Sequence, residues 1–215
     1  MKYSLVIFDL DGTILNTLDD LTDSCNAVLK ENGFPVHTKD EIKSFVGNGI
    51  PKLIERALPS DTDISTKEKI TEEFTAYYRE HSAVKTAPYP GIAELLKTLK
   101  ASGIKIAVNT NKHEGTAIDV CSKYFPGLID MVAGGKYDTP HKPDPSGTEK
   151  ILSSLKEKKE NTLFVGDSDV DILTAVNTDI DCASAAWGFR SEQFLKDHGA
   201  KNIVHDCNEL KNFIL

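Results

Sequence analysis

Short, largely apolar runs recur along this chain, and they constrain its fold more than any other feature. The first covers Tyr3 to Phe8 and stops at Asp9. The later runs lie at Ile104–Val108, Ile129–Ala133, Thr162–Val165, Ile180–Ala183 and Asn202–Val204. Apolar runs of this length are typical of strands that are buried on both faces, as in a parallel sheet.

Helical patterns lie between most of these runs. The clearest covers residues 90–102, which Pro90 opens and Gly103 closes. Its apolar stripe is formed by Ile92, Leu95, Leu96 and Leu99. Strands that alternate with helices predict an α/β fold with an open, Rossmann-like parallel sheet and right-handed crossovers. Ligands of such sheets bind at the carboxyl ends of the strands.

The stretch from residue 16 to residue 82 has a different pattern, with no convincing strand. Its apolar residues follow helical spacing, and the pairs Thr38–Glu41 and Ser65–Glu68 predict capping boxes at two helix starts. We therefore expect a helical domain at 16–82, inserted into an α/β core formed by residues 1–15 and 83–215.

Charge and cysteine usage narrow the classes of partner. The chain of 215 residues has a formal net charge of −8, and an acidic surface repels nucleic acids and anionic membranes. The four cysteines form no C-x-x-C pair, which argues against a thiolate metal site or a redox motif. Scattered thiols suit a reducing cytoplasm, although four could form two disulfides.

No segment has the length of a membrane span, and the N-terminal apolar run is too short for the core of a signal peptide. We expect a cytoplasmic monomer or homodimer with no nucleic-acid or membrane partner. A small anionic substrate would then need a local cluster of cations or a metal.

Two acidic residues follow the first apolar run, in the segment Asp9-Leu10-Asp11-Gly12-Thr13. A simple turn is one interpretation, because Asp-Gly is a common turn pair. However, two carboxylates at the end of a buried strand repel each other unless a cation or a shared proton relieves them. An EF-hand loop is excluded because Gly12 stands at its fourth position and not its sixth.

A second acidic segment, residues 166–171, follows the buried run at 163–165. Taken alone it could be a solvated turn, and it also fails the EF-hand pattern, with Ile172 at the glycine position. Together with Asp9 and Asp11, Asp167 supplies the hard oxygen ligands that magnesium prefers.

Two further polar segments follow core elements. Thr110, Asn111 and Lys112 come after the run that ends at Val108, and Lys142 lies between His141 and Pro143, just before a helical pattern. Each has a simpler interpretation: the Thr110 hydroxyl could stabilise a turn, and Lys142 could be a solvated loop lysine. The neighbouring prolines would restrict the backbone and so the direction of the lysine.

In order and flanking sequence, the acid pair, hydroxyl, lysine and acid cluster resemble the four motifs of the haloacid dehalogenase superfamily. The inserted helices resemble that superfamily's all-helical cap. Additional segments resemble its phosphoglycolate phosphatase branch: Phe45–Gly49, Pro88–Gly91, Asn109–Lys112 and Trp187–Arg190. Thr178-Asp179 departs from the Ala-Gly that is usual in that branch, at a spot that shapes a turn.

The resemblance implies a magnesium-dependent phosphatase that acts on small phosphorylated metabolites. Asp9 would be the nucleophile, and Asp11 the acid that protonates the leaving group and then activates water. Thr110 and Lys142 would bind the phosphoryl group, and Asn111 would also bind the substrate.

The resemblance also implies that magnesium is bound by Asp9, by the backbone carbonyl of Asp11 and by Asp167, while Asp171 orients this shell. Asp11 favours phosphate over halide chemistry, because the dehalogenase members lack an acid there. In the cap, Gly47, Asn48 and Gly49 would read the leaving group, although an ordinary helix–helix turn is an equal alternative.

Other functions stay open at this point. A phosphosugar mutase would use the same nucleophile, but relatives of that kind usually carry a histidine where this chain has Leu21. A pyrophosphatase or a nucleotidase would share the same core. A non-enzymatic receiver that accepts one phosphoryl group as a signal also combines acids, a hydroxyl and a lysine.

Overall fold

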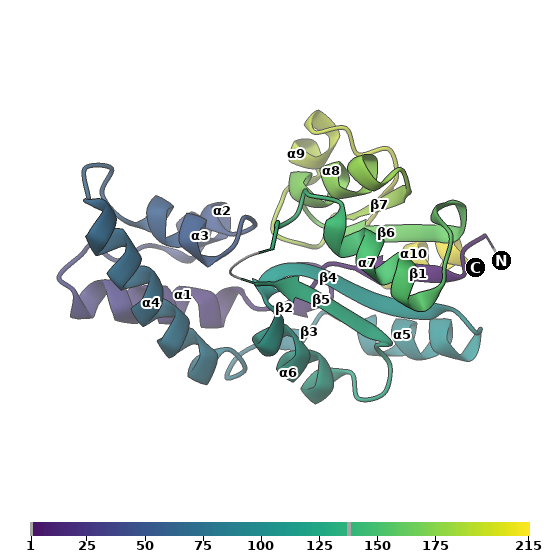
Figure 1. The fold of residues 1–215 in the computed structure, drawn as a ribbon, viewed down its shortest axis with the longest axis horizontal. Coiled ribbons are helices and arrows are strands. Elements are labelled where there is room, and N and C mark those ends of the chain that lie inside the picture. Colours follow the sequence, from purple (N-terminus) through teal and green to yellow (C-terminus); the bar gives the residue numbers. More distant parts are fainter. Residues whose placement is uncertain (1, 137–138) are drawn as a thin grey trace. The chain divides into compact units, whose positions relative to one another are not determined.

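The computed structural model describes residues 2–136 and 139–215, which form two compact units. One unit consists of residues 1–15 and 88–215 and is built around a β-sheet. The other consists of residues 16–87 and is almost entirely helical (Figure 1).

The sheet has six strands in the order β5-β4-β1-β6-β7-β8, and every neighbouring pair is parallel. Its strands are β1 (Leu5–Phe8), β4 (Lys105–His113), β5 (Met131–Gly135), β6 (Thr162–Gly166), β7 (Asp181–Ala185) and β8 (Ile203–Val204). The predicted Rossmann-like parallel sheet is therefore confirmed, with one strand near each apolar run. β4 continues past Val108 to His113, and its pairing with β5 shifts register after Asn109.

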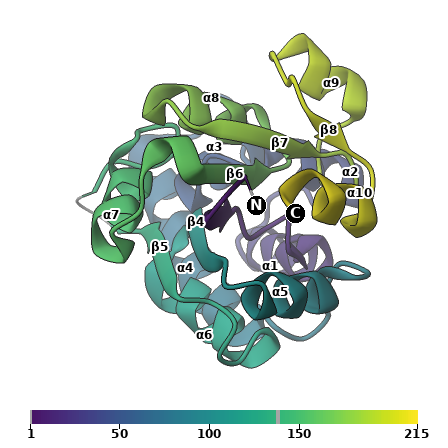
Figure 2. The ribbon, with the colours of Figure 1, turned by 90° about the vertical axis from the view of Figure 1, so that its right-hand side faces the viewer.

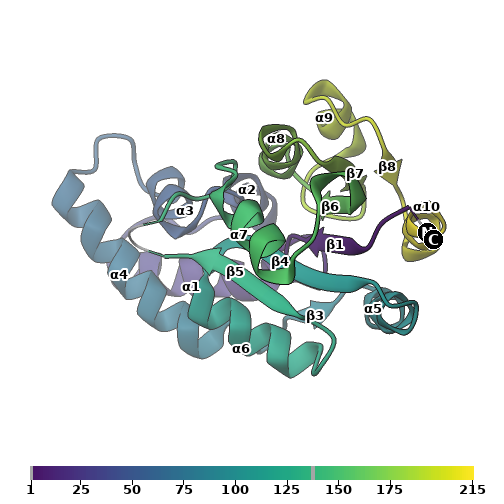
Figure 3. The ribbon, with the colours of Figure 1, turned by 45° about the vertical axis from the view of Figure 1, so that its right-hand side comes forward.

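Helices cover both faces of this sheet, as Figures 2 and 3 show. One face carries α5 (Ile92–Ala101), α6 (Glu114–Tyr124) and α10 (Cys207–Ile214). The other carries α7 (Ser146–Leu155) and α8 (Asp169–Thr178). The one-turn helix η1 (Lys159–Asn161) precedes β6, and α9 (Glu192–Asp197) lies between β7 and β8 in sequence.

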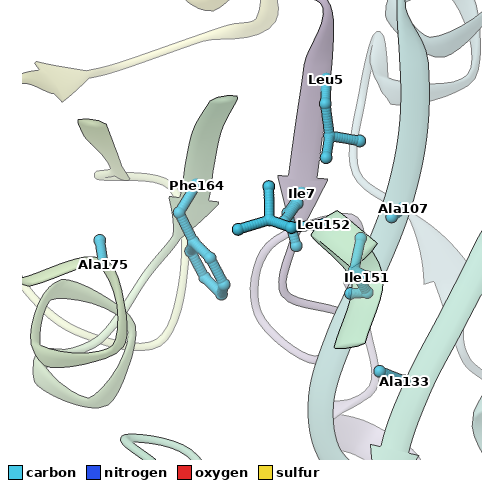
Figure 4. Close-up of a cluster of buried hydrophobic side chains, with 8 residues drawn as sticks. All are labelled: Leu5, Ile7, Ala107, Ala133, Ile151, Leu152, Phe164 and Ala175. Atoms are coloured by element: carbon cyan, nitrogen blue, oxygen red, sulfur yellow. The ribbon is translucent and has the colours of Figure 1, made fainter. Parts of the chain in front are cut away.

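The face beneath α7 and α8 buries the apolar side chains of alternate strand positions (Figure 4). Leu5, Ile7 and Phe164 from the sheet pack against Ile151 from α7 and Ala175 from α8. Burying a side chain of the size of leucine or phenylalanine stabilises a fold by about 1.5–3 kcal/mol. This packing holds β1 at the centre of the sheet and fixes the position of the residues that follow it.

The second unit contains α1 (Leu18–Glu31), α2 (Lys39–Phe45), α3 (Ile50–Ala57) and α4 (Ile64–His81). Its helical character is as predicted, and Thr38 and Glu41 form the predicted capping box of α2. The Ser65–Glu68 box is wrong. α4 begins earlier because the Asp63 carboxylate accepts hydrogen bonds from the Thr66 amide and hydroxyl. The short strands β2 (Leu15–Asn16) and β3 (Ala87–Pro88) pair where the chain passes between the units.

Asp20 on α1 is a buried carboxylate, only 3% exposed, that binds the segment after α4. It accepts hydrogen bonds from the amides of Val84, Lys85 and Thr86, at 3.1, 2.8 and 2.8 Å, and from the Thr86 hydroxyl at 2.7 Å. Residues 83–87 therefore belong to the helical unit, and the division falls at 87/88, whereas the sequence pattern placed it at 82/83.

Within the described residues no helix is both long and apolar enough to cross a membrane. The four cysteines, Cys25, Cys121, Cys182 and Cys207, are free thiols.

We predict that Asp20→Asn lowers the free energy of unfolding by about 2–3 kcal/mol, because an amide cannot accept all the hydrogen bonds of this buried carboxylate. Asp23→Asn is the matched control: Asp23 lies on the same helix, and its ion pair with Lys85 is solvent-exposed. The control should change stability by less than about 0.5 kcal/mol. Urea unfolding followed by circular dichroism measures both, and equal losses would contradict the assignment.

Candidate active site

The parallel register brings three of the predicted site segments to one edge of the sheet. Phe8, the last residue of β1, pairs with Val108 on β4 and with Val165 on β6. Asp9 follows at once, Thr110 lies two residues beyond Val108, and Asp167 two residues beyond Val165. The edge at which they meet is the carboxyl end of the sheet, where ligands of such folds bind.

Lys142 joins this group from the loop before α7, and its side chain is 3% exposed. Its Nζ lies 2.6 Å from Asp171 Oδ1, in a hydrogen bond, and 2.9 Å from Asp9 Oδ1. The contact between Lys142 Nζ and Asp9 Oδ1 is an ion pair whose angles do not fit a hydrogen bond. Burial alone would lower the pKa of Lys142, but the charges of Asp171 and Asp9 outweigh it and raise the pKa above its usual value. The two carboxylates therefore favour the charged ammonium form of this side chain.

The Asn111 side chain holds the backbone of Lys142. Its Oδ1 accepts a hydrogen bond from the Lys142 amide at 2.8 Å, and its Nδ2 donates to the Lys142 carbonyl at 3.1 Å. This pair of bonds fixes the loop that carries the lysine. In the structure Asn111 therefore positions Lys142, and its predicted contact with the substrate stays a prediction.

Asp171 is fully buried at the start of α8. Its Oδ2 accepts hydrogen bonds from the Ser168 hydroxyl at 2.6 Å and from the amides of Ser168 and Asp167 at 3.1 Å. Ser168 and Asp171 together form the capping box of this helix. The carboxylate that pairs with Lys142 is therefore fixed by the start of a helix, which sets its direction.

Asp167 lies in a tight cradle and is 2% exposed. Its oxygens accept hydrogen bonds from the Thr13 hydroxyl at 3.0 Å and from the Phe189 amide at 2.6 Å. A Cβ at Gly188 would lie 2.2 Å from Asp167 Cβ, and one at Gly12, where φ is +88°, would lie 2.5 Å from Asp167 Oδ2. Only glycine fits at these two positions.

Asp9, Asp167 and Asp171 each offer a carboxylate oxygen, and these oxygens lie within 4.8 Å of one another. Burial, together with the charge of Asp171, raises the pKa of both Asp9 and Asp167. The positive charge of Lys142 lowers the pKa of Asp9, but by less than burial and the neighbouring carboxylates raise it. Crowded carboxylates that a single lysine does not neutralise fit a hard divalent cation, which takes oxygen ligands.

Asp11 is paired with a different lysine. Lys112 Nζ lies 3.1 Å from Asp11 Oδ1 and 3.4 Å from Oδ2, and the lysine side chain is 3% exposed. Thr110 and Lys112 are two residues apart on β4. The buried Thr110 hydroxyl accepts a hydrogen bond from the Lys112 amide at 3.2 Å.

Sequence reasoning gave no role to Lys112, Thr13 or Phe189. The expected strand ended at Val108, whereas β4 continues to His113, so the sequence pattern did not place Lys112 on the strand. The contacts that Thr13 and the Phe189 amide make with Asp167 join positions 154 and 22 residues apart, and no local pattern encodes them.

Comparison with known proteins places this site in a family. Residues 6–185 match the family model of haloacid dehalogenase-like hydrolases. A phosphoglycolate phosphatase of Aquifex aeolicus (strain VF5) is 33% identical over 86% of this chain and 85% of its own length. One of Psychrobacter arcticus is 30% identical over the whole of this chain and 97% of its own.

Solved structures agree with this placement. A crystal structure from Lactobacillus delbrueckii subsp. bulgaricus has a TM-score of 0.96 and 34% identity, covering 100% of this chain and 99% of that one. That of a predicted phosphoglycolate phosphatase from Haemophilus somnus has a TM-score of 0.92 and 26% identity, with the same coverage. The chain belongs to the haloacid dehalogenase-like hydrolase family, as the four motifs indicated.

We predict that magnesium raises the melting temperature more at pH 8 than at pH 5.5. The pKa values of Asp9 and Asp167 are raised on folding, so without metal the folded state keeps protons that the unfolded chain releases. Their contribution to stability is present at low pH and is lost as the pH rises through the folded pKa values. Magnesium binds the ionised carboxylates and so restores more stability at the higher pH.

Differential scanning calorimetry with and without magnesium measures this gain. Asp167→Asn should remove it, whereas Asp169→Asn, the matched control two residues on, should keep it. An equal gain at both pH values, or a full gain in the Asp167 variant, would contradict this metal site.

Proposed function

We propose that this chain is a magnesium-dependent phosphatase that hydrolyses small phosphate monoesters through a phospho-aspartate on Asp9. The contact of Asp9 with the buried cation Lys142, beside two further carboxylates, is the observation that carries the proposal. The relatives that are named phosphoglycolate phosphatases support the reaction class.

Asp9 suits the role of nucleophile. Its carboxylate oxygen would attack phosphorus, and the bond from phosphorus to the ester oxygen would break. Lys142 favours the ionised form of Asp9 and offers positive charge to the phosphoryl oxygens. The Thr110 hydroxyl would donate a hydrogen bond to one of these oxygens.

Asp11 suits the role of acid and base. It would donate a proton to the leaving oxygen as the ester bond breaks, so that the product leaves as an alcohol. The resulting carboxylate would then take a proton from the water that attacks the phospho-aspartate, and inorganic phosphate would leave. Asp11 thereby regains in the second step the proton that it donates in the first, and Asp9 is released from phosphorus as a free carboxylate.

We assign the metal to Asp9, the backbone carbonyl of Asp11 and Asp167, with Asp171 orienting this shell through Lys142 and the start of α8. When bound, Mg²⁺ supplies positive charge that lowers the repulsion between an anionic nucleophile and an anionic phosphate.

Phosphoglycolate is the substrate we favour, because the curated relatives carry that name. The loop of Gly47, Asn48 and Gly49 is our candidate for reading the leaving group. Within the helical unit Arg56 holds this loop, since its guanidinium donates hydrogen bonds to the Phe45 carbonyl at 2.7 Å and to Asn48 Oδ1 at 2.9 Å.

We predict that Asp9→Asn lowers phosphate release by at least about 1,000-fold, because an amide cannot form the phosphoryl-enzyme. Release of inorganic phosphate from phosphoglycolate and from a panel of phosphorylated metabolites, with magnesium present, measures the effect. Asp119→Asn is the control, a substitution of an exposed residue on α6 that should leave activity unchanged.

The same assay separates an enzyme from a receiver. Many phosphates released per chain support the phosphatase, whereas one stoichiometric phosphorylation without turnover would support a receiver. Wild-type rates in the Asp9 variant would refute the nucleophile assignment.

A further inference from the structure

Lys112 is a second buried lysine at the site, and none of the proposed reaction steps uses it. The two lysines, Lys112 and Lys142, pair with different carboxylates of the site. Lys142 lies against Asp9 and Asp171, and Lys112 lies against Asp11. A buried ammonium group is costly unless an opposite charge compensates it, so the direction of Lys112 toward Asp11 has an energetic cause.

Both ends of this contact are anchored in the α/β unit. Lys112 lies in β4, and the hydrogen bond from its amide to the Thr110 hydroxyl fixes the local backbone. Asp11 lies in the turn after β1, which the hydrogen bond from the Gly12 amide to the Leu15 carbonyl closes at 2.9 Å. With both backbones held, the contact of one ammonium with both carboxylate oxygens restricts the rotamers of Asp11.

We propose that Lys112 is a positioning residue for Asp11, which it holds in the orientation that exchanges a proton with the leaving oxygen. This inference rests on the proposed function. As the bond from phosphorus to the ester oxygen breaks, its electron pair stays on that oxygen and the Asp11 proton moves to it. The Asp11 carboxylate that remains faces the Lys112 ammonium; in the structure Lys112 Nζ lies 3.1 Å from Asp11 Oδ1.

This role differs from phosphoryl binding in a measurable way. A residue that serves the general acid matters only when the leaving group needs a proton. Alkyl phosphates expel a basic alkoxide and need one. 2,4-Dinitrophenyl phosphate expels a stable phenolate and needs none. The ratio of kcat/KM for the two kinds of ester therefore reports on Asp11, and kcat/KM reflects only the steps up to phosphoryl transfer.

We predict that Lys112→Met lowers kcat/KM by about 100-fold for ethyl phosphate and phosphoglycolate, in the lower range for loss of general acid catalysis. For 2,4-dinitrophenyl phosphate the loss of kcat/KM should stay below about 3-fold, because its leaving group needs no general acid. Asp11→Asn should show the same selectivity. The double variant should lose less than the product of the two single losses, because the residues act as a unit.

All three esters are measured on one preparation, so a partly unfolded variant lowers every rate equally and leaves the ratios intact. Lys112→Gln provides a second variant if Lys112→Met does not fold. Lys97→Met is the control; Lys97 is exposed, pairs with Glu94 on α5 and should leave every rate unchanged.

Three results would overturn the inference. An equal loss on all esters would assign Lys112 to the phosphoryl group or the fold. A loss with phosphoglycolate but not with ethyl phosphate would assign it to a substrate carboxylate. Unchanged rates would remove any role in the reaction. If the wild type turned over no ester, the proposed function itself would fail, which is a separate outcome.

Discussion

The ion pairs of Lys142 with Asp9 and Asp171 are the interaction on which the site depends. This buried ammonium offsets the repulsion among the three carboxylates that crowd at the sheet edge. Each partner is fixed by a different part of the fold. Asp9 follows the central strand, Asp171 belongs to the first turn of α8, and the Lys142 backbone is held by Asn111. The packing that sets these elements therefore also sets the charges.

The arrangement divides the chemistry between two neighbouring acids. Asp9 is in contact with a lysine that also binds Asp171, which suits a residue that must stay ionised beside a phosphate. Asp11 pairs with a separate lysine, Lys112. The helical unit uses the same device for a different purpose, because the buried Asp20 carboxylate, bound by backbone amides, ties the end of that unit to its first helix.

Much of this could be predicted from sequence, for physical reasons that differ by element. Strands that are buried on both faces are largely apolar along their length, so the sequence predicted the sheet and the motifs at its strand ends. The start of α4 was not, because Asp63 and Ser65 both suit an N-cap and only the chain geometry selects Asp63. The boundary at 87/88 depends on the long-range contacts of Asp20. The Asp167 cradle likewise depends on Thr13 and Phe189, which folding alone brings near.

The most direct test of the account is to trap the covalent intermediate. The wild-type protein is mixed with phosphoglycolate and magnesium, quenched in acid within milliseconds, digested and mapped by mass spectrometry. The account predicts one phosphoryl group on the peptide that contains Asp9, and on the Asp9 side chain itself. A phosphoryl group on any other residue, or turnover at full rate with no trapped adduct at any quench time, would contradict it.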